Sequence, residues 1–262
     1  MSHKTIILFD MDGTLTPARL PADASMGKIL NKLTKYAKVG IVTGSDFDYL
    51  MQQCAPIWEE VDLSDIVLMP CNGTKLYNWI NSEWKLCDSV NMKEELGESH
   101  FNLLMKVLIG AQFTHISTDP DHDLTGHFIS YRGSMINWCP VGRNASQKER
   151  EKFISYDKKT DMRFKLMTGI QAMLNKAMGE EKVMFALGGN TSIDIYPVGW
   201  DKTYALKHFP EWDCWFVGDR CEPSGNDFSI YEKLSKEKRA YKTSGPEDTI
   251  SKIETIISKL KL

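Results

Sequence analysis

The amino-acid sequence predicts an α/β protein whose core is built on a parallel β-sheet and is interrupted by an inserted α+β domain with an antiparallel sheet. Short, almost wholly apolar runs near both ends of the chain each stop at a polar turn, as expected for parallel strands buried on both faces. A helical pattern separates the first two runs, and that order describes a β-α-β unit. The middle of the chain instead alternates polar and apolar residues, which is typical of antiparallel strands with one face in solvent.

The core strands are expected at four apolar runs, which lie at residues 5–9, 39–43, 66–69 and 214–217. Helices are expected between or after them, from Ser25 to Tyr36 and from Pro246 to Leu262. In parallel sheets the functional groups gather at the carboxyl ends of the strands. The polar turns that follow the four runs are therefore the places where a site is expected.

The insertion is expected over residues 89–196, which leaves 1–88 and 197–262 as the two halves of a discontinuous catalytic core. Its alternating segments lie at residues 128–132, 135–139, 183–187 and 192–196. Helical segments accompany them at about 98–112 and 147–178.

Composition excludes several classes of protein. The 262 residues are 42% hydrophobic and 26% charged with a net charge of −3, so there is no basic field to attract nucleic acid or anionic lipid. No apolar run approaches membrane-spanning length, and the first residues do not fit a signal peptide. Six cysteines without a C-x-x-C pair favour free thiols in a reducing compartment. We expect a cytoplasmic protein with no nucleic-acid and no membrane partner.

The informative motif is Asp10-Met-Asp12-Gly13-Thr14, placed directly after the first buried strand. Two carboxylates one residue apart leave a strand end in different directions, and Gly13 lets the chain turn tightly. One carboxylate could then attack a phosphoryl group while the other handles a proton. A bare D-x-D is more often a solvated turn with an Asp helix cap, but the strand before it and the Gly-Thr-Leu-Thr after it favour phosphate chemistry.

This motif resembles the signature of the haloacid-dehalogenase-like phosphotransferases, which have a Rossmannoid core with a parallel sheet and an inserted cap. The resemblance implies three further elements, and the chain offers each in order. They are a hydroxyl at Ser45, with Thr43 as a weaker candidate, a lysine at Lys202, and an acidic residue at Asp219, with Asp227 close behind.

These elements form a coherent site for a phosphoryl group. Mg²⁺ held by Asp10, the Asp12 backbone carbonyl and Asp219 would offset the charge of the carboxylates and the phosphate. Lys202 and Ser45 would complete the cradle around the phosphoryl group. Each element alone is weak, because a single lysine is usually at the surface and Gly-Asp after a strand is often only a turn.

Further blocks resemble the eukaryotic-type phosphomannomutases almost from end to end. These blocks are Leu15-Thr-Pro-Ala-Arg19, Gly44-Ser-Asp46, Phe128-x3-Arg132-Gly-x-Met135, Pro140-Val-Gly-Arg143, Ser146-Gln-x-Glu-Arg150, Gly188-Gly-x-x-Ser192-x-Asp194, Pro197-x-Gly-Trp-Asp-Lys202, Gly225-Asn-Asp227 and Pro246-Glu-Asp248. The similarity implies that Asp10 is the phosphorylated nucleophile, that Asp12 is the general acid/base, and that the insertion closes over the core as a cap.

The same resemblance assigns sugar-phosphate binding to six residues, which are Arg19, Arg132, Arg143, Arg150, Ser192 and Asp194. Planar guanidinium groups grip a distal phosphate better than lysines do. Ser192 and Asp194 share one face of their strand, where the carboxylate could accept bonds from sugar hydroxyls. The competing interpretation of the cap arginines is ordinary surface pairing with neighbouring glutamates.

The chain also departs from the family pattern. It has Pro70-Cys71-Asn72-Gly73 in place of P-E-N-G, and the segment from Tyr231 to Lys238 lacks the positions that resemble a second cation site in relatives. We therefore expect one catalytic Mg²⁺. Asp119-Pro-Asp-His-Asp123 with His127 could suggest a metal cluster, but such residues crowd together more often in exposed turns.

The family resemblance implies an isomerase that interconverts mannose 6-phosphate and mannose 1-phosphate, with a hexose 1,6-bisphosphate as activator and intermediate. It also implies a homodimer formed through the cap domains and a place in GDP-mannose supply for glycosylation. Glucose phosphates are possible substrates as well. Two alternatives stay open, namely a capped sugar-phosphate phosphatase of the same superfamily and a non-catalytic protein built on a decayed enzyme fold.

Overall fold

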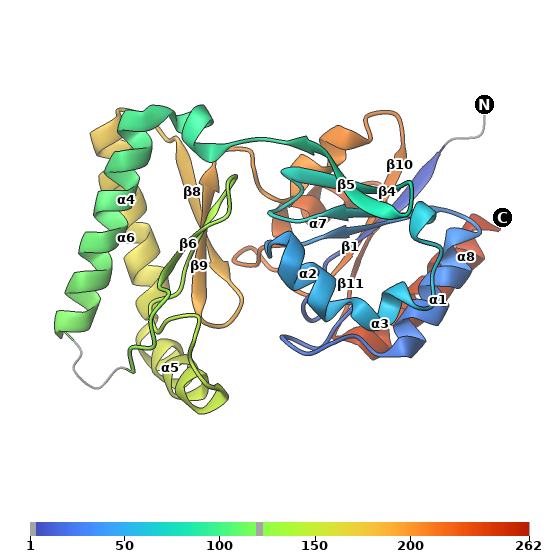
Figure 1. The fold of residues 1–262 in the computed structure, drawn as a ribbon, viewed down its shortest axis with the longest axis horizontal. Coiled ribbons are helices and arrows are strands. Elements are labelled where there is room, and N and C mark those ends of the chain that lie inside the picture. The colour runs from blue at the N-terminus through green and yellow to red at the C-terminus, as the bar shows by residue number, and fades with distance from the viewer. Residues whose placement is uncertain (1–3, 119–122, 262) are drawn as a thin grey trace. The chain divides into compact units, whose positions relative to one another are not determined.

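The computed structural model describes residues 4–118 and 123–261. The chain forms two compact units, Met1–Ser89 with Trp200–Leu262, and Val90–Gly199. Each unit has its own β-sheet (Figure 1). The prediction of an α/β protein with a mainly parallel sheet and a separate antiparallel sheet is confirmed.

The first unit is built on a seven-stranded sheet with the order β11-β10-β1-β2-β3-β4-β5. Its strands are β1 (Thr5–Phe9), β2 (Lys38–Val42), β3 (Ile66–Met69), β4 (Lys75–Ile80), β5 (Glu83–Ser89), β10 (Asp213–Gly218) and β11 (Ala240–Lys242). The five strands from β11 to β3 run parallel, whereas β4 and β5 form an antiparallel hairpin at one edge. Chain order reverses around β1, which lies between β10 and β2, and such a switch point is where open α/β sheets bind ligands.

Helices cover both faces of this sheet. They are α1 (Ala24–Thr34), α2 (Phe47–Gln53), α3 (Ala55–Trp58) and η1 (Leu63–Asp65), followed by η2 (Lys202–His208), α7 (Phe228–Ser235) and α8 (Pro246–Leu260). Ile7 and Phe9 of β1 pack on one face with α1 and α8, while Ile6 and Leu8 face η2 and α7 on the other. All four side chains are fully buried, which explains why the strand reads as an uninterrupted apolar run.

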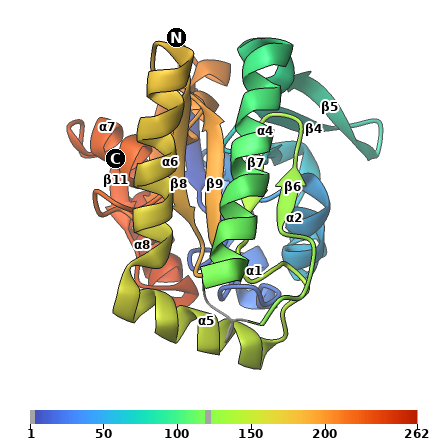
Figure 2. The ribbon, with the colours of Figure 1, turned by 90° about the vertical axis from the view of Figure 1, so that its left-hand side faces the viewer.

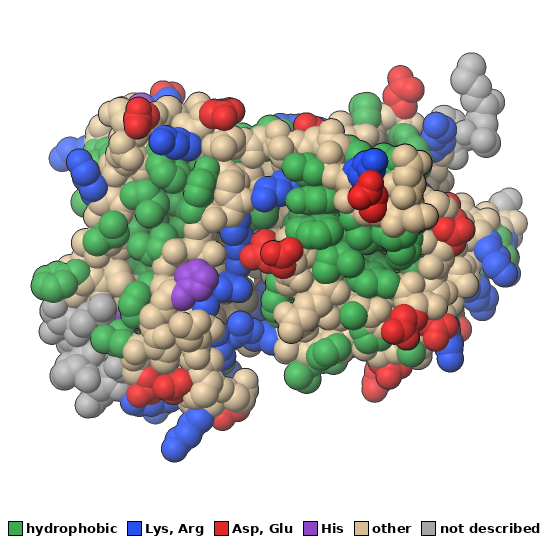
Figure 3. Space-filling view, in the orientation of Figure 1, with side chains coloured by type: hydrophobic (Ala, Val, Ile, Leu, Met, Phe, Trp, Pro, Cys, Tyr) green, Lys and Arg blue, Asp and Glu red, His purple; other side chains and the backbone are tan. Residues whose placement is uncertain are grey.

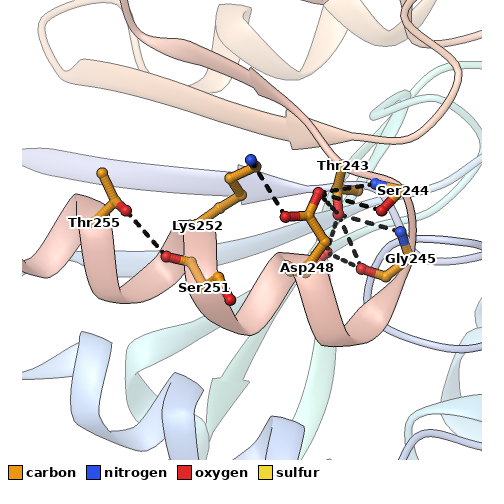
Figure 4. A network of polar contacts seen from close by, with 8 residues as sticks. Thr243, Ser244, Gly245, Asp248, Ser251, Lys252 and Thr255 are labelled. Carbon is orange, nitrogen blue, oxygen red and sulfur yellow. Dashed lines mark hydrogen bonds and ion pairs between the residues drawn. The ribbon is translucent and has the colours of Figure 1, made fainter.

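A polar network holds the start of α8 (Figure 4). The Asp248 carboxylate accepts a hydrogen bond from the Ser244 backbone N–H at 3.0 Å and pairs with Lys252 at 3.3 Å. The buried Thr249 hydroxyl donates to the Thr243 hydroxyl at 2.9 Å. These contacts satisfy backbone and side-chain groups at a helix end that has Pro246 at its first position.

The second unit has a four-stranded antiparallel sheet with the order β6-β7-β9-β8. Its elements are β6 (Ile129–Tyr131), β7 (Ile136–Trp138), β8 (Val183–Gly188), β9 (Ser192–Pro197), α4 (Met92–Thr118), α5 (Gln147–Thr160) and α6 (Met162–Met178). Helices α4 and α6 lie over one face of the sheet (Figure 2). Asn137 and Asp194 are direct cross-strand partners, so their side chains share a face of the sheet.

The structure differs from the expected elements at several places, and it also contains β11, α2, α3 and α7, which the sequence did not predict. The helical pattern over 147–178 is two helices, because Asp161 takes a left-handed backbone conformation (φ 53°) and ends α5. Helix α4 begins before the expected 98–112 segment and contains a non-helical residue, Gly97. The hairpin of β4 and β5 was not predicted. Among the described residues, no helix combines the length and the apolarity needed to cross a membrane.

Candidate active site

Asp10 and Asp219 come together because their strands are neighbours. Asp10 follows β1 directly, and its N–H donates to the carbonyl of Val217 in β10 at 2.9 Å. Asp219 follows β10, which runs parallel to β1. The carboxyl ends of parallel strands meet at one edge of the sheet, so two residues more than 200 positions apart in sequence share one site.

Three carboxylates and one ammonium group form the centre of this site. Asp10, Asp219 and Asp227 each offer an oxygen, and these oxygens lie within 4.8 Å of one another. The fully buried Lys202 donates from Nζ to Asp10 Oδ1 and, at 2.5 Å, to Asp227 Oδ1. Asp227 Oδ2 accepts the backbone N–H of Arg220 at 3.0 Å. Asp227, which the sequence left as a second acidic candidate, is thus part of the cluster.

Burial and the excess of negative charge both shift the pKa values of this cluster. Burial raises the pKa of Asp10 well above its usual value, and the carboxylates of Asp227 and Asp219 raise it further against the opposing effect of Lys202. Burial also raises the pKa of Asp219, with Asp227 adding to the shift. Burial alone would lower the pKa of Lys202, but Asp10 and Asp227 outweigh it and raise that pKa. With all groups ionised the net charge is −2, three negative charges against one positive.

These residues fit a hard divalent cation. The Asp219 Oδ1 atom is buried and has no hydrogen-bond partner within the described structure. Carboxylate and carbonyl oxygens are the ligands that Mg²⁺ prefers, and a charge of +2 balances the net charge of the cluster. Gly13 makes room beside this group, because its φ is +87° and a Cβ atom there would lie 2.8 Å from the Asp219 Cγ. Asp10 and Asp219 could therefore hold the ion, with Asp227 beside them.

Asp12 lies in the turn after Asp10, where two donors hold its carboxylate. Asp12 Oδ1 accepts the backbone N–H of Arg19 at 3.0 Å and the hydroxyl of Tyr49 at 3.2 Å. Burial raises the pKa of Tyr49 to about 12, and the nearby Asp12 charge contributes to the shift, so the phenol stays protonated at neutral pH. Sequence reasoning missed Tyr49, because a single tyrosine on a helix carries no signal of a contact 37 residues away.

Ser45 and Thr43 lie in the turn after β2. The Thr43 hydroxyl accepts the Ser45 backbone N–H at 3.1 Å, and the Ser45 carbonyl accepts the N–H of Cys71 at 2.9 Å. Gly73 packs tightly against η2, since a Cβ atom there would lie 2.7 Å from the backbone N of Ala205. The turn after β3 is therefore fastened both to the Ser45 turn and to the helix that begins at Lys202.

In the second unit, a polar chain links two of the predicted sugar-phosphate residues. Arg143 Nη1 donates to Asn137 Oδ1 at 2.8 Å, and Asn137 Nδ2 donates to Asp194 Oδ1 at 2.7 Å. Gly188 lies beside this carboxylate, where a Cβ atom would lie 2.6 Å from Asp194 Oδ2. Asn137 was not among the predicted site residues, although its alternating position in the strand places it on the face of Asp194.

The remaining predicted residues of this unit are also held by local contacts. The three guanidinium nitrogens of Arg150 donate to the Ala145 carbonyl, the Thr191 hydroxyl and the Arg143 carbonyl, at 3.0, 2.9 and 2.6 Å. The Ser192 carbonyl accepts from Arg163, at 2.8 Å. These contacts orient Arg150 and connect it to the turn that carries Arg143.

The structure also places Arg132 and part of the aspartate- and histidine-rich segment. The Arg132 residue is buried, and its backbone N–H donates to the Met135 carbonyl at 2.8 Å. Residues 119–122 of the aspartate- and histidine-rich segment lie outside the described residues. Asp123 pairs with Lys152 at 3.2 Å.

Two solved structures with a similar fold are a nucleotidase and a phosphatase. An IMP-bound, N-terminally truncated IMP-nucleotidase from Plasmodium falciparum matches 98% of this chain and 68% of its own, with a TM-score of 0.68 and 15% identity. A trehalose-6-phosphate phosphatase from Aspergillus fumigatus matches 98% of this chain and 93% of its own, with a TM-score of 0.53 and 16% identity. These likenesses concern the fold, which is haloacid-dehalogenase-like.

Sequence relatives match over nearly the whole chain. The phosphomannomutase of Encephalitozoon cuniculi is 35% identical and the alignment covers 99% of this chain and 96% of the relative. The phosphomannomutase of Saccharomyces cerevisiae is 34% identical, with 94% and 92% covered. The family model of eukaryotic phosphomannomutases matches residues 26–259. The resemblance read from the sequence blocks is confirmed, and the chain belongs to the eukaryotic phosphomannomutase family.

Proposed function

We propose that this protein is a phosphomannomutase that interconverts mannose 6-phosphate and mannose 1-phosphate through a phosphoaspartate on Asp10. One observation carries the proposal, namely that Lys202 binds the Asp10 carboxylate inside a cluster of acidic groups at the end of β1. A carboxylate oriented by a lysine and placed among oxygen ligands for a cation suits attack on phosphorus. The names of the relatives support the choice of substrate.

In the proposed reaction, an Asp10 oxygen attacks a phosphorus of a hexose 1,6-bisphosphate, and the bond between that phosphorus and the sugar oxygen breaks. The departing sugar oxygen takes a proton from Asp12, which acts as general acid. In the reverse sense, Asp12 accepts the proton of a sugar hydroxyl, and that oxygen attacks the phosphorus held on Asp10. The bisphosphate thus serves as both activator and intermediate.

The charges of the site fit this sequence of steps. Lys202 contacts the nucleophile directly and would also contact the phosphoryl oxygens in transit, while Ser45 is proposed to donate its hydroxyl to them. A Mg²⁺ held by Asp10, the Asp12 backbone carbonyl and Asp219 would supply positive charge for the phosphoryl group and keep the carboxylates ionised.

The second unit, proposed to be the cap, would bind the rest of the sugar phosphate. Its polar sheet face carries Asp194 tied through Asn137 to Arg143, and Arg150 is fastened to the same turn. Guanidinium groups suit the distal phosphate, and the Asp194 carboxylate suits sugar hydroxyls. Three further residues are proposed for the same ligand, namely Arg19, Arg132 and Ser192. These side chains recognise the phosphate groups more strongly than the configuration of any one sugar hydroxyl. Glucose phosphates should therefore also react.

The proposal extends to the assembly of the protein and to its setting. Helices α4 and α6 expose large apolar side chains, including Ile109 (58%) and Phe113 (71%) on α4 and Phe164 (51%) on α6. Figure 3 shows apolar surface, in green, on both units. We propose that the second unit forms a homodimer through such residues. The expected setting is the cytoplasm and the expected role is supply of mannose 1-phosphate for GDP-mannose synthesis.

One experiment tests the reaction. The protein is incubated with mannose 1-phosphate, Mg²⁺ and glucose 1,6-bisphosphate, and both mannose 6-phosphate and free phosphate are measured. Mannose 6-phosphate is the expected main product, and dominant release of phosphate would show a phosphatase instead. Asp10→Asn is expected to abolish both products and the labelled phosphoenzyme, and an active variant would refute the assigned nucleophile.

A further inference from the structure

We propose that Tyr49 is a positioning residue for phosphoryl transfer, because its phenol holds the Asp12 carboxylate in one orientation. The inference rests on the proposed function, in which Asp12 exchanges a proton with the sugar oxygen. Tyr49 does not touch the reacting phosphorus in this scheme. It acts through Asp12, with the main chain of Arg19 as its partner.

The geometry assigns the two oxygens of Asp12 to different tasks. The Tyr49 hydroxyl and the Arg19 N–H both donate to Oδ1, at 3.2 and 3.0 Å. An oxygen that already accepts two hydrogen bonds has its lone-pair directions occupied, which leaves the other oxygen of the carboxylate to meet the sugar. Proton exchange with the sugar is therefore assigned to Oδ2, which is aimed by the two bonds on Oδ1.

The sequence places both donors by separate local devices. Asp46 caps α2 by accepting the Tyr49 backbone N–H at 3.0 Å, and the tyrosine ring packs against the core beside it. Arg19 takes a left-handed backbone conformation (φ 65°), which is unusual for a residue with a side chain. Strain of this kind persists where the surrounding structure over-determines it, and it gathers at functional sites. Two segments, 7 and 37 residues away, thus converge on one carboxylate oxygen.

A competing explanation runs through the side chain of Arg19. The Arg19 side chain lies close enough to Tyr49 to oppose the rise in the pKa of the phenol, so the phenol could serve a phosphate-binding arginine instead of Asp12. The two explanations differ in what they do to the kinetics. A fault in proton transfer lowers kcat and leaves KM unchanged, whereas a fault in phosphate binding raises KM.

Tyr49→Phe removes only the hydroxyl and keeps the ring in the core. The matched control is Tyr77→Phe. The Tyr77 ring stacks on Phe47, which lies on the same helix as Tyr49, with ring centroids 4.3 Å apart, and Tyr77 packs against the same core cluster as Tyr49. Conversion of mannose 1-phosphate with glucose 1,6-bisphosphate is expected to lose about tenfold in kcat for Tyr49→Phe, with KM unchanged. Tyr77→Phe is expected to match the wild type, and both variants should keep the wild-type melting temperature.

A change of leaving group separates positioning from a general loss of structure. Formation of the phosphoenzyme from 4-nitrophenyl phosphate needs little help from a general acid, because 4-nitrophenolate departs without a proton. Tyr49→Phe is therefore expected to form it at the wild-type rate. An unchanged kcat with the hexose phosphate, a raised KM, or an equal loss with both donors would overturn the inference. A wild-type protein that makes no mannose 6-phosphate would overturn the proposed function and this inference with it.

Discussion

The contact of Gly13 with Asp219 leads to a prediction that separates backbone strain from damage to the cation site. In Gly13→Ala the new Cβ atom would lie 2.8 Å from the Asp219 Cγ. Carbon atoms in contact prefer about 3.5 Å or more, so the carboxylate must move by roughly 0.7 Å. Metal–ligand distances tolerate only about 0.2 Å, and we expect the Mg²⁺ affinity to fall about 10- to 100-fold.

Gly199→Ala is the matched control for that substitution. Gly199 has φ +79°, close to the +87° of Gly13, and nothing lies within 4 Å of its Cβ position. Each alanine should cost about 1–2 kcal/mol of stability through left-handed backbone strain, as measured by urea unfolding without metal. Mutase rate is then titrated with Mg²⁺, and only Gly13→Ala should need more of the ion. Equal Mg²⁺ midpoints for the two variants would refute the assignment of Asp219 as a ligand.

Three further predictions concern the charged groups. Lys202→Met leaves Asp10 buried without its counter-charge, so urea unfolding at neutral pH should show a loss of about 3–5 kcal/mol, and unchanged stability would contradict the burial argument. Asn137→Ala breaks the link between Arg143 and Asp194. Steady-state kinetics should then show about a tenfold rise in KM for mannose 1-phosphate with little change in kcat. A fall in kcat alone would place Asn137 outside substrate binding. The Ser244 N–H lowers the pKa of Asp248, so Asp248→Asn should lower the free energy of unfolding by about 0.5–1 kcal/mol at neutral pH. In acid unfolding curves this difference between variant and wild type should disappear as the pH falls through the folded-state pKa of Asp248. A difference that stays constant with pH would contradict this.

The elements that sequence reasoning found are those whose pattern is local. Each fully buried parallel strand is an apolar run, and the pattern ends where the strand ends. The β4–β5 hairpin was missed, although its turn carries a sequence signal in the two turn-forming residues Asn81 and Ser82. In the structure both take the left-handed conformation of a two-residue hairpin turn. The break between α5 and α6 at Asp161 was not predictable from the sequence, because a single Asp also occurs within helices and its φ depends on packing.

Within the site, the sequence by itself determined which residues could carry the proposed chemistry. An Asp-x-Asp-Gly after a buried strand, a later lysine and a late Gly-Asp predict a nucleophile, an acid/base and ligands for a cation, because strand order brings strand ends to one edge. Only the tertiary structure decided which neighbours tune these groups. Asp227 joins the cluster through Lys202, Tyr49 holds Asp12, and Asn137 joins Arg143 to Asp194. Such contacts depend on side chains that converge from distant segments, and their spacing in the chain follows no period that a sequence pattern can reveal.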